Sequence, residues 1–70
     1  MGKRVKIHDF TKPELDKIFA LANFTSDEAD YFWLRSKGKS IIQICFEMSI
    51  SESKANTLSN KVNKKIIKVL

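Results

Sequence analysis

The chain is 70 residues long, which allows one small domain, and its 43% hydrophobic content with few Gly and Pro favours helices and excludes a disordered tail. A single Cys and a single His exclude an intrachain disulfide and a tetrahedral zinc site, and no apolar run is long enough for a signal-peptide core or a membrane span. We therefore expect a cytoplasmic protein, and we expect no cofactor. The net charge of +5 indicates a polyanionic partner, nucleic acid before membrane.

The first ten residues, MGKRVKIHDF, alternate charged and apolar side chains between Arg4 and His8, a pattern typical of a short strand or an extended arm. A lone strand has nothing in this chain to pair with. We therefore expect residues 1–10 to stay loose or to pack along a domain formed by residues 11–70. Pairing of the arm with a second copy is the alternative.

The segment TKPELDKIFALA carries the start signal of a helix. Thr11 and Glu14 have the spacing of a capping box, and Pro13 falls in the first turn. We predict a helix over about residues 12–22. Its buried face is expected to contain Leu15, Ile18, Phe19 and Ala22.

A second capping box follows at Thr25 and Glu28, with Asp27 where the helix dipole favours negative charge. This helix is predicted to end at Gly38, which supplies a left-handed cap. The inward face is expected to consist of Ala29, Phe32 and Trp33, with Tyr31 and Leu34 on its flanks.

The third predicted helix, IIQICFEM, is capped by Ser40 and is apolar on two sides. One stripe contains Ile41, Ile44, Cys45 and Met48, and the other contains Ile42 and Phe46. Two apolar stripes predict a helix that is covered on both sides and sits centrally.

The last predicted helix is capped by Ser51 and extends as far as Val69. Its apolar face is expected to contain Ala55, Leu58, Val62 and Ile66. The connection to the preceding helix is only SIS, residues 49–51. The apolar residues around this corner are Ile44, Met48, Ile50, Ala55 and Leu58. With small Cys45 and Ala55 where the helices cross, the pattern predicts a helix-turn-helix unit at about residues 40–60.

Residues 24–66 resemble the tetrahelical helix-turn-helix domains of LuxR-type regulators and of sigma factor region four. The family's motifs L-R-x-x-G-K-S, I-A-x-x-L and I-S-x-x-T-V are matched by Leu34, Arg35, Gly38, Lys39, Ser40, Ile44, Cys45, Met48, Ile50 and Ser51. Departures are Ser49 for the turn glycine, Cys45 for the small Ala, and Lys54 with Ala55 for the Thr-Val pair. The resemblance implies a tetrahelical all-α domain with a long C-terminal recognition helix. The pattern of the first ten residues, which lie outside the resemblance, adds an extended N-terminal arm to this small four-helix domain.

The polar face of the last helix is predicted to enter the major groove of double-stranded DNA, with residues 51–64 as the recognition helix. The expected base contacts are Ser51, Glu52, Ser53, Asn56, Thr57 and Asn60. The expected backbone contacts are Lys37, Lys39, Ser40, Lys54, Lys61 and Lys64. The charge agrees, because residues 36–70 hold seven lysines against two glutamates, whereas charges cancel in residues 1–35.

We expect no enzyme, because capping explains the carboxylates at helix starts and Cys45 falls on a predicted buried face. The expected function is that of a small stand-alone transcription regulator of phage or mobile-element origin. The alternative is a protein-interaction module that binds RNA polymerase, a sigma-type partner or itself without reading bases. The apolar C-terminal tail has two interpretations, which the sequence leaves open. Either Ile66, Ile67 and Leu70, or the N-terminal arm, form the seam of a homodimer, or the tail closes the first helix onto the domain.

Overall fold

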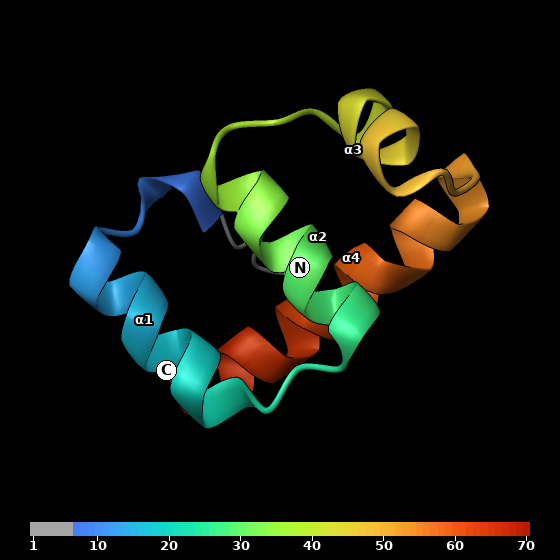
Figure 1. Ribbon diagram of the computed structural model, residues 1–70. Helices are drawn as coiled ribbons and strands as arrows, with labels where there is room; N and C mark the ends of the chain where they lie inside the picture. Colours follow the sequence, from blue (N-terminus) through green and yellow to red (C-terminus); the bar gives the residue numbers. More distant parts are fainter. Residues whose placement is uncertain (1–6) are drawn as a thin grey trace, which may run out of the picture.

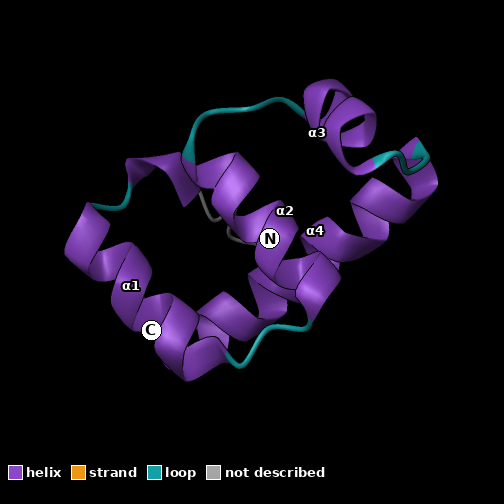
Figure 2. Cartoon of the chain, in the orientation of Figure 1, coloured by secondary structure: helices purple, strands orange, loops and turns teal. Residues whose placement is uncertain are grey.

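The computed structural model describes residues 7–70, and every regular element in that range is helical. The elements in chain order are a 3₁₀ turn η1 (Ile7–Asp9), α1 (Lys12–Ala22), α2 (Ser26–Ser36), α3 (Ile41–Met48) and α4 (Glu52–Val69) (Figure 1). Figure 2 shows these helices joined by short loops, with no strand among the described residues. The prediction of a small all-α domain with four helices is confirmed.

The longest helix, α4, organises the fold because all three other helices pack on it. Its 18 residues span about 27 Å at 1.5 Å per residue, which is close to the whole width of the molecule. In Figure 1 its N-terminal end lies beside α3 and its C-terminal end lies beside α1. The N-terminal half of α4 therefore packs on α3, and the C-terminal half packs on α1 and α2.

Local side-chain bonds set the helix starts. Thr11, Thr25 and Ser40 each accept a bond from the third residue of their helix, whose own side chain accepts from the capping residue's backbone N–H. The first two are the predicted capping boxes, and the third pairs Ser40 with Gln43. Because each bond spans three residues, the sequence alone is enough to place these starts.

The core lies between α2 and α4, and its largest fully covered side chains are Tyr31, Phe32, Ile44, Val62 and Ile66. The inward face of α2 differs from the prediction. It is formed by Glu28, Tyr31 and Phe32, whereas Ala29 and Trp33 are only half-buried. The difference arises because Trp33 turns toward α1, where its ring centroid lies 5.2 Å from that of Phe19.

Glu28 is a buried carboxylate, only 4% exposed, and it joins α2 to α4. Its Oε1 accepts bonds from the Lys65 ammonium and from the Thr25 backbone N–H, and Lys65 also donates to the Asn23 carbonyl. Burial acts to raise the pKa of Glu28, but the bonds from Lys65 and Thr25 outweigh it and hold that pKa below its ordinary value. Lys65 is thus a structural residue, and our expectation from the sequence missed this pair.

The N-terminal segment is not extended over the residues that the structure describes. Residues 1–6 of the predicted arm lie outside the described range. Ile7 begins a 3₁₀ turn, its carbonyl accepts from the Phe10 N–H at 3.2 Å, and its side chain is 3% exposed. An apolar Ile has a free-energy reason to leave water, so this part packs on α2, as in one of the three possibilities given for the arm.

The predicted central position of α3 is wrong. Ile44 is fully covered, but Ile42 is 60% and Phe46 is 82% exposed. The reason is that α3 packs only through the stripe that faces α2 and α4, and no described element covers its second stripe. Figure 1 shows α3 at the edge of the molecule, on the side away from α1.

Candidate nucleic-acid interface

The corner between α3 and α4 is closed by backbone bonds. Ser49 adopts a left-handed conformation with φ 55°, and its N–H donates to the Phe46 carbonyl. The Ile50 N–H donates to the Cys45 carbonyl at 3.0 Å. These two bonds form a Schellman cap, and Ser51 then starts α4 by accepting from the Lys54 N–H at 3.2 Å. The chain therefore turns within three residues and leaves few backbone groups unpaired.

Apolar packing fixes the direction in which α4 leaves the corner. Ile44 and Ala55 are fully covered, and Leu58 is 4% exposed. Met48 and Ile50 are half-buried and pack against the same core. Four of the five residues predicted to hold the corner thus pack in one core, and the fifth, Ala55, is buried as well. The opposite face of α4 is left toward solvent.

The outward face of α4 is polar over its first three turns. A ridge with spacings of four, three and four residues consists of Ser53, Thr57, Asn60 and Lys64, all exposed. Asn56 is exposed on the flank of this ridge. The Thr57 hydroxyl donates to the Ser53 carbonyl at 3.0 Å. Four of the six predicted base-contact residues therefore lie together on one accessible surface.

The other two predicted base-contact residues occupy different settings. Ser51 is exposed, but its hydroxyl oxygen is engaged in capping α4. Glu52 is exposed and lines an apolar hollow on α3 together with Ile42 and Phe46. Both residues therefore lie beside the ridge of α4 rather than on it.

The predicted backbone contacts fall into two groups. Lys54, Lys61 and Lys64 are exposed on α4, and no carboxylate among residues 7–70 lies within 4.0 Å of their Nζ atoms. Lys39 instead pairs with Glu47 at 3.1 Å, with 37% of its side chain exposed. A phosphate that approaches Lys39 would have to compete with this ion pair.

The loop before α3 is held in place by Arg35. Its Nη1 donates to the Lys39 carbonyl at 2.9 Å, and Gly38 adopts φ 84° as the predicted left-handed cap. The Gly38 N–H donates to the Arg35 carbonyl, which completes the cap of α2. Lys37 stays exposed in this loop, while Ser40 is engaged in its capping box. Arg35 is a positioning residue that the sequence alone did not reveal.

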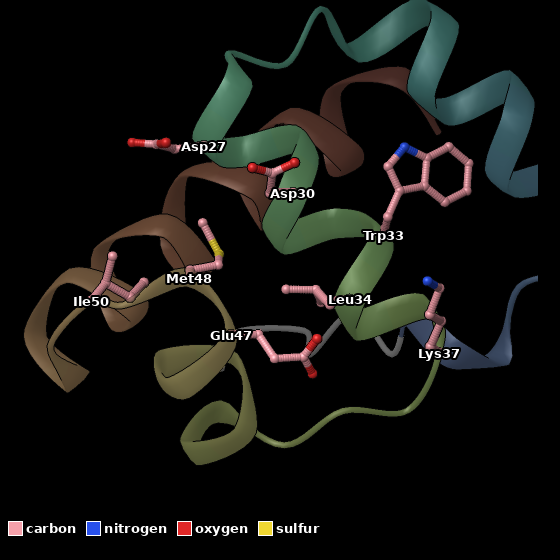
Figure 3. Close-up of a pocket in the computed structure, with 8 residues that line it drawn as sticks. All are labelled: Asp27, Asp30, Trp33, Leu34, Lys37, Glu47, Met48 and Ile50. Atoms are coloured by element: carbon pink, nitrogen blue, oxygen red, sulfur yellow. The ribbon is translucent and has the colours of Figure 1, made fainter.

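An acidic groove of about 490 Å³ lies between α2 and the corner. Figure 3 shows Leu34 of α2 and Met48 of α3 in this groove, with carboxylates around it. The charged lining residues are Asp27, Asp30, Lys37 and Glu47. Glu47 is already paired with Lys39, and the other two carboxylates, Asp27 and Asp30, disfavour a phosphate inside the groove itself.

Two apolar patches stay exposed. The α3 patch consists of Ile42, Cys45, Phe46 and Ile50 around one hollow. The C-terminal patch consists of Phe10, Leu21, Val69 and Leu70, and the nearby Ile67 is 53% exposed. Ile66 cannot form a dimer seam as predicted, because it is fully covered in the core of the monomer.

The described residues also bear on a metal site and on a membrane-spanning helix. No group of three metal-ligating side chains occurs within residues 7–70, and no helix in that range is long and apolar enough to cross a membrane. Comparison of the chain with protein-family models, with curated proteins and with solved structures finds no match. The case for a function therefore depends on the geometry and chemistry of the corner and of α4.

Proposed function

We propose that this protein is a small sequence-specific regulator of transcription that binds double-stranded DNA through a helix-turn-helix. In this proposal α3 and α4 are the two helices of the unit, and the first three turns of α4 enter the major groove. Lysines around the unit hold phosphates, and polar residues of the outward ridge contact base edges. The resemblance of residues 24–66 to LuxR-type and sigma region-four domains agrees with it.

The observation that carries the proposal is the polar ridge of α4, which stands directly opposite the buried face of the same helix. Ser53, Thr57 and Asn60 are short and exposed, so the helix is slim enough for a groove about 12 Å wide. Ala55, on the opposite side of α4, is fully buried, and α3 packs on α4. A helix that only needed solubility would not require such short side chains along its outer ridge.

Charge supports the same partner. Lys37, Lys54, Lys61 and Lys64 are exposed, and ion pairs within residues 7–70 leave all four available. About five phosphate contacts would make the affinity fall about 10²- to 10³-fold between 50 and 200 mM salt. Lys39 adds to these contacts only when it leaves Glu47, and Lys65 stays with Glu28.

The test is a titration of duplex DNA by fluorescence anisotropy at several salt concentrations. Lys61→Ala and Lys64→Ala should each lower the slope of log affinity against log salt by about one, with similar loss on every sequence. The matched control is Lys17→Ala, which removes the same charge from the exposed face of α1. Absence of binding at low salt, or equal effects of Lys17→Ala and Lys61→Ala, would refute the proposal.

A second candidate function is a protein-interaction module, and the exposed α3 patch favours it. Phe46 is 82% exposed and Ile42 lies one turn before it, an apolar pair that the fold itself leaves uncovered. The partner that covers this patch would be RNA polymerase, a sigma-type protein or a second copy of the chain. Sedimentation of the protein and of the Phe46→Ser variant measures self-association, and this distinguishes the interaction module from the DNA-binding regulator. Self-association that Phe46→Ser abolishes, without DNA binding, would favour the module.

A further inference from the structure

The two edges of α4 differ in chemistry. On one edge, spacings of seven, four and three residues place Lys54, Lys61, Lys65 and Lys68 in a row. On the other edge lie Asn56 and Asn63, which form a row with Asn60 of the ridge at spacings of four and three residues. The edge with the lysines faces the start of α2, because the Lys65 ammonium on that edge binds Glu28. The outward ridge thus has cations on one side and amides on the other.

Side chains suited to guanine lie off the outward ridge over the first three turns of α4. Guanine is read mainly by Arg or Lys through its O6 and N7 atoms, and adenine by Asn or Gln through N6 and N7. Helix α4 contains no Arg, and Lys54 and Lys61 lie on the edge away from the amides. Lys64 lies on the ridge one turn beyond Asn60, where the helix has passed the N-terminal turns that contact bases.

We propose that the ligand is A·T-rich duplex DNA, with Asn56 and Asn60 each bonding the N6 and N7 atoms of an adenine. This inference rests on the proposed function and names the base pairs that the same surface selects. Four residues advance about 6 Å along a helix, so the two amides reach base pairs no more than about two steps apart.

Thr57 adds a contact of the same specificity. Its hydroxyl donates to the Ser53 carbonyl at 3.0 Å, so the hydrogen is already used within the helix. The side chain of Thr57 is exposed, and its other group is a methyl. A threonine methyl makes apolar contact with the C5-methyl of thymine, the base that pairs with adenine.

Folding gives no reason for these asparagines. Asn is a poorer helix former than Ala or Lys, because its amide competes for backbone bonds. Asn56 and Asn60 are exposed, and neither makes a side-chain hydrogen bond within residues 7–70. Their amides are therefore available to a ligand on the outer surface of α4.

The experiment compares three duplexes of equal length and backbone charge by anisotropy at fixed low salt. One is rich in A·T pairs, one is rich in G·C pairs, and one repeats the first with 7-deazaadenine in place of adenine. That base lacks the N7 acceptor but leaves the minor groove unchanged. We expect the A·T duplex to bind about tenfold or more tightly than the G·C duplex, and 7-deazaadenine to remove most of the difference.

Variants assign the preference to residues. Asn56→Ala and Asn60→Ala should each reduce the A·T preference about fivefold or more, while binding to the G·C duplex changes little. The matched control is Asn63→Ala, which makes the same change at a half-buried position one turn farther along the amide edge. Circular dichroism should show unchanged helix content, because Ala is the better helix former.

The outcomes separate the inference from the proposed function. Salt-dependent binding without A·T preference, or a preference that survives 7-deazaadenine, would overturn the inference alone. Equal effects of Asn63→Ala and Asn60→Ala would also overturn it. Failure to bind any duplex at low salt would overturn both the inference and the proposed function.

Discussion

The body formed by α1, α2 and α4 and the outlying helix α3 differ in how far their apolar side chains are covered. The body contains Tyr31, Phe32, Val62 and Ile66, each almost wholly removed from water. In α3 only Ile44 is fully buried, whereas Phe46 is among the most exposed apolar residues described. Stability is therefore concentrated in the body, and α3 together with the outward ridge of α4 forms the surface available to partners.

The aromatic contacts show the same contrast. Phe32 lies 5.0 Å from Phe24 and 5.1 Å from Trp33 between ring centroids, so it occupies the middle of an aromatic cluster. Phe46 appears in no aromatic pair within residues 7–70. Residues of one type thus serve packing in one region and stay free in the other.

The largest difference in the free energy of unfolding should appear when one phenylalanine in each region is replaced by alanine. Phe32→Ala leaves a cavity at a fully covered site and should lower the free energy of unfolding by about 3–5 kcal/mol. A chain of this size has only about 4–10 kcal/mol in total, so much of the variant should be unfolded at 37 °C. Phe46→Ala should change it by less than about 0.5 kcal/mol. Urea titration followed by circular dichroism measures both, and similar losses would contradict the comparison.

The next effect concerns the pair that ties α2 to α4. Lys65→Met should lower the free energy of unfolding at pH 7 by about 2 kcal/mol, because Glu28 then stays charged and buried without its partner. That value allows for solvent screening, since 32% of the Lys65 side chain is exposed. Glu14→Gln is the control. Glu14 has the same capping-box position in α1 that Glu28 has in α2, but it is exposed. Its cost should stay below about 0.5 kcal/mol.

The same pair predicts a pH dependence. The folded pKa of Glu28 is lowered, so its contribution is fully present above the unfolded value near 4.5 and is lost as pH falls through the folded pKa. The free energy of unfolding should therefore fall on acidification below about pH 4.5. Glu28→Gln should show a smaller fall over that window in urea titrations at each pH. An unchanged pH profile would mean that Glu28 does not contribute.

The smallest changes in the free energy of unfolding are expected from two substitutions in the corner between α3 and α4. They should have opposite signs, although the two positions are only two residues apart. Ser49→Gly should raise the free energy of unfolding by about 0.5–1 kcal/mol, because Gly adopts the φ of 55° without strain. Ser51→Ala removes the cap of α4 and should lower it by about 1 kcal/mol. Thermal unfolding should resolve both shifts. A loss of stability in Ser49→Gly would show that the left-handed turn is not where the strain lies.

The ends of the helices could be predicted from the sequence, because they are set by interactions between residues close together in the chain. The bonds of Thr11, Thr25, Ser40 and Ser51 each span three residues, and Gly38 marks the end of α2 through its own backbone preference. The buried face of α4 follows in the same way from the spacing of its apolar residues. The polar ridge of the candidate site is the complement of that face and was predicted with it.

Features that join distant residues needed the folded chain. The Glu28–Lys65 pair links positions 37 residues apart, and no local pattern distinguishes that lysine from its neighbours. Both apolar stripes of α3 look equally buried in the sequence, yet only the stripe of Ile44 meets α2 and α4. Ile66 and Ile67 are adjacent and alike, but one is covered and the other is not. Periodicity shows which residues share a face, whereas packing of whole helices selects the face that leaves water.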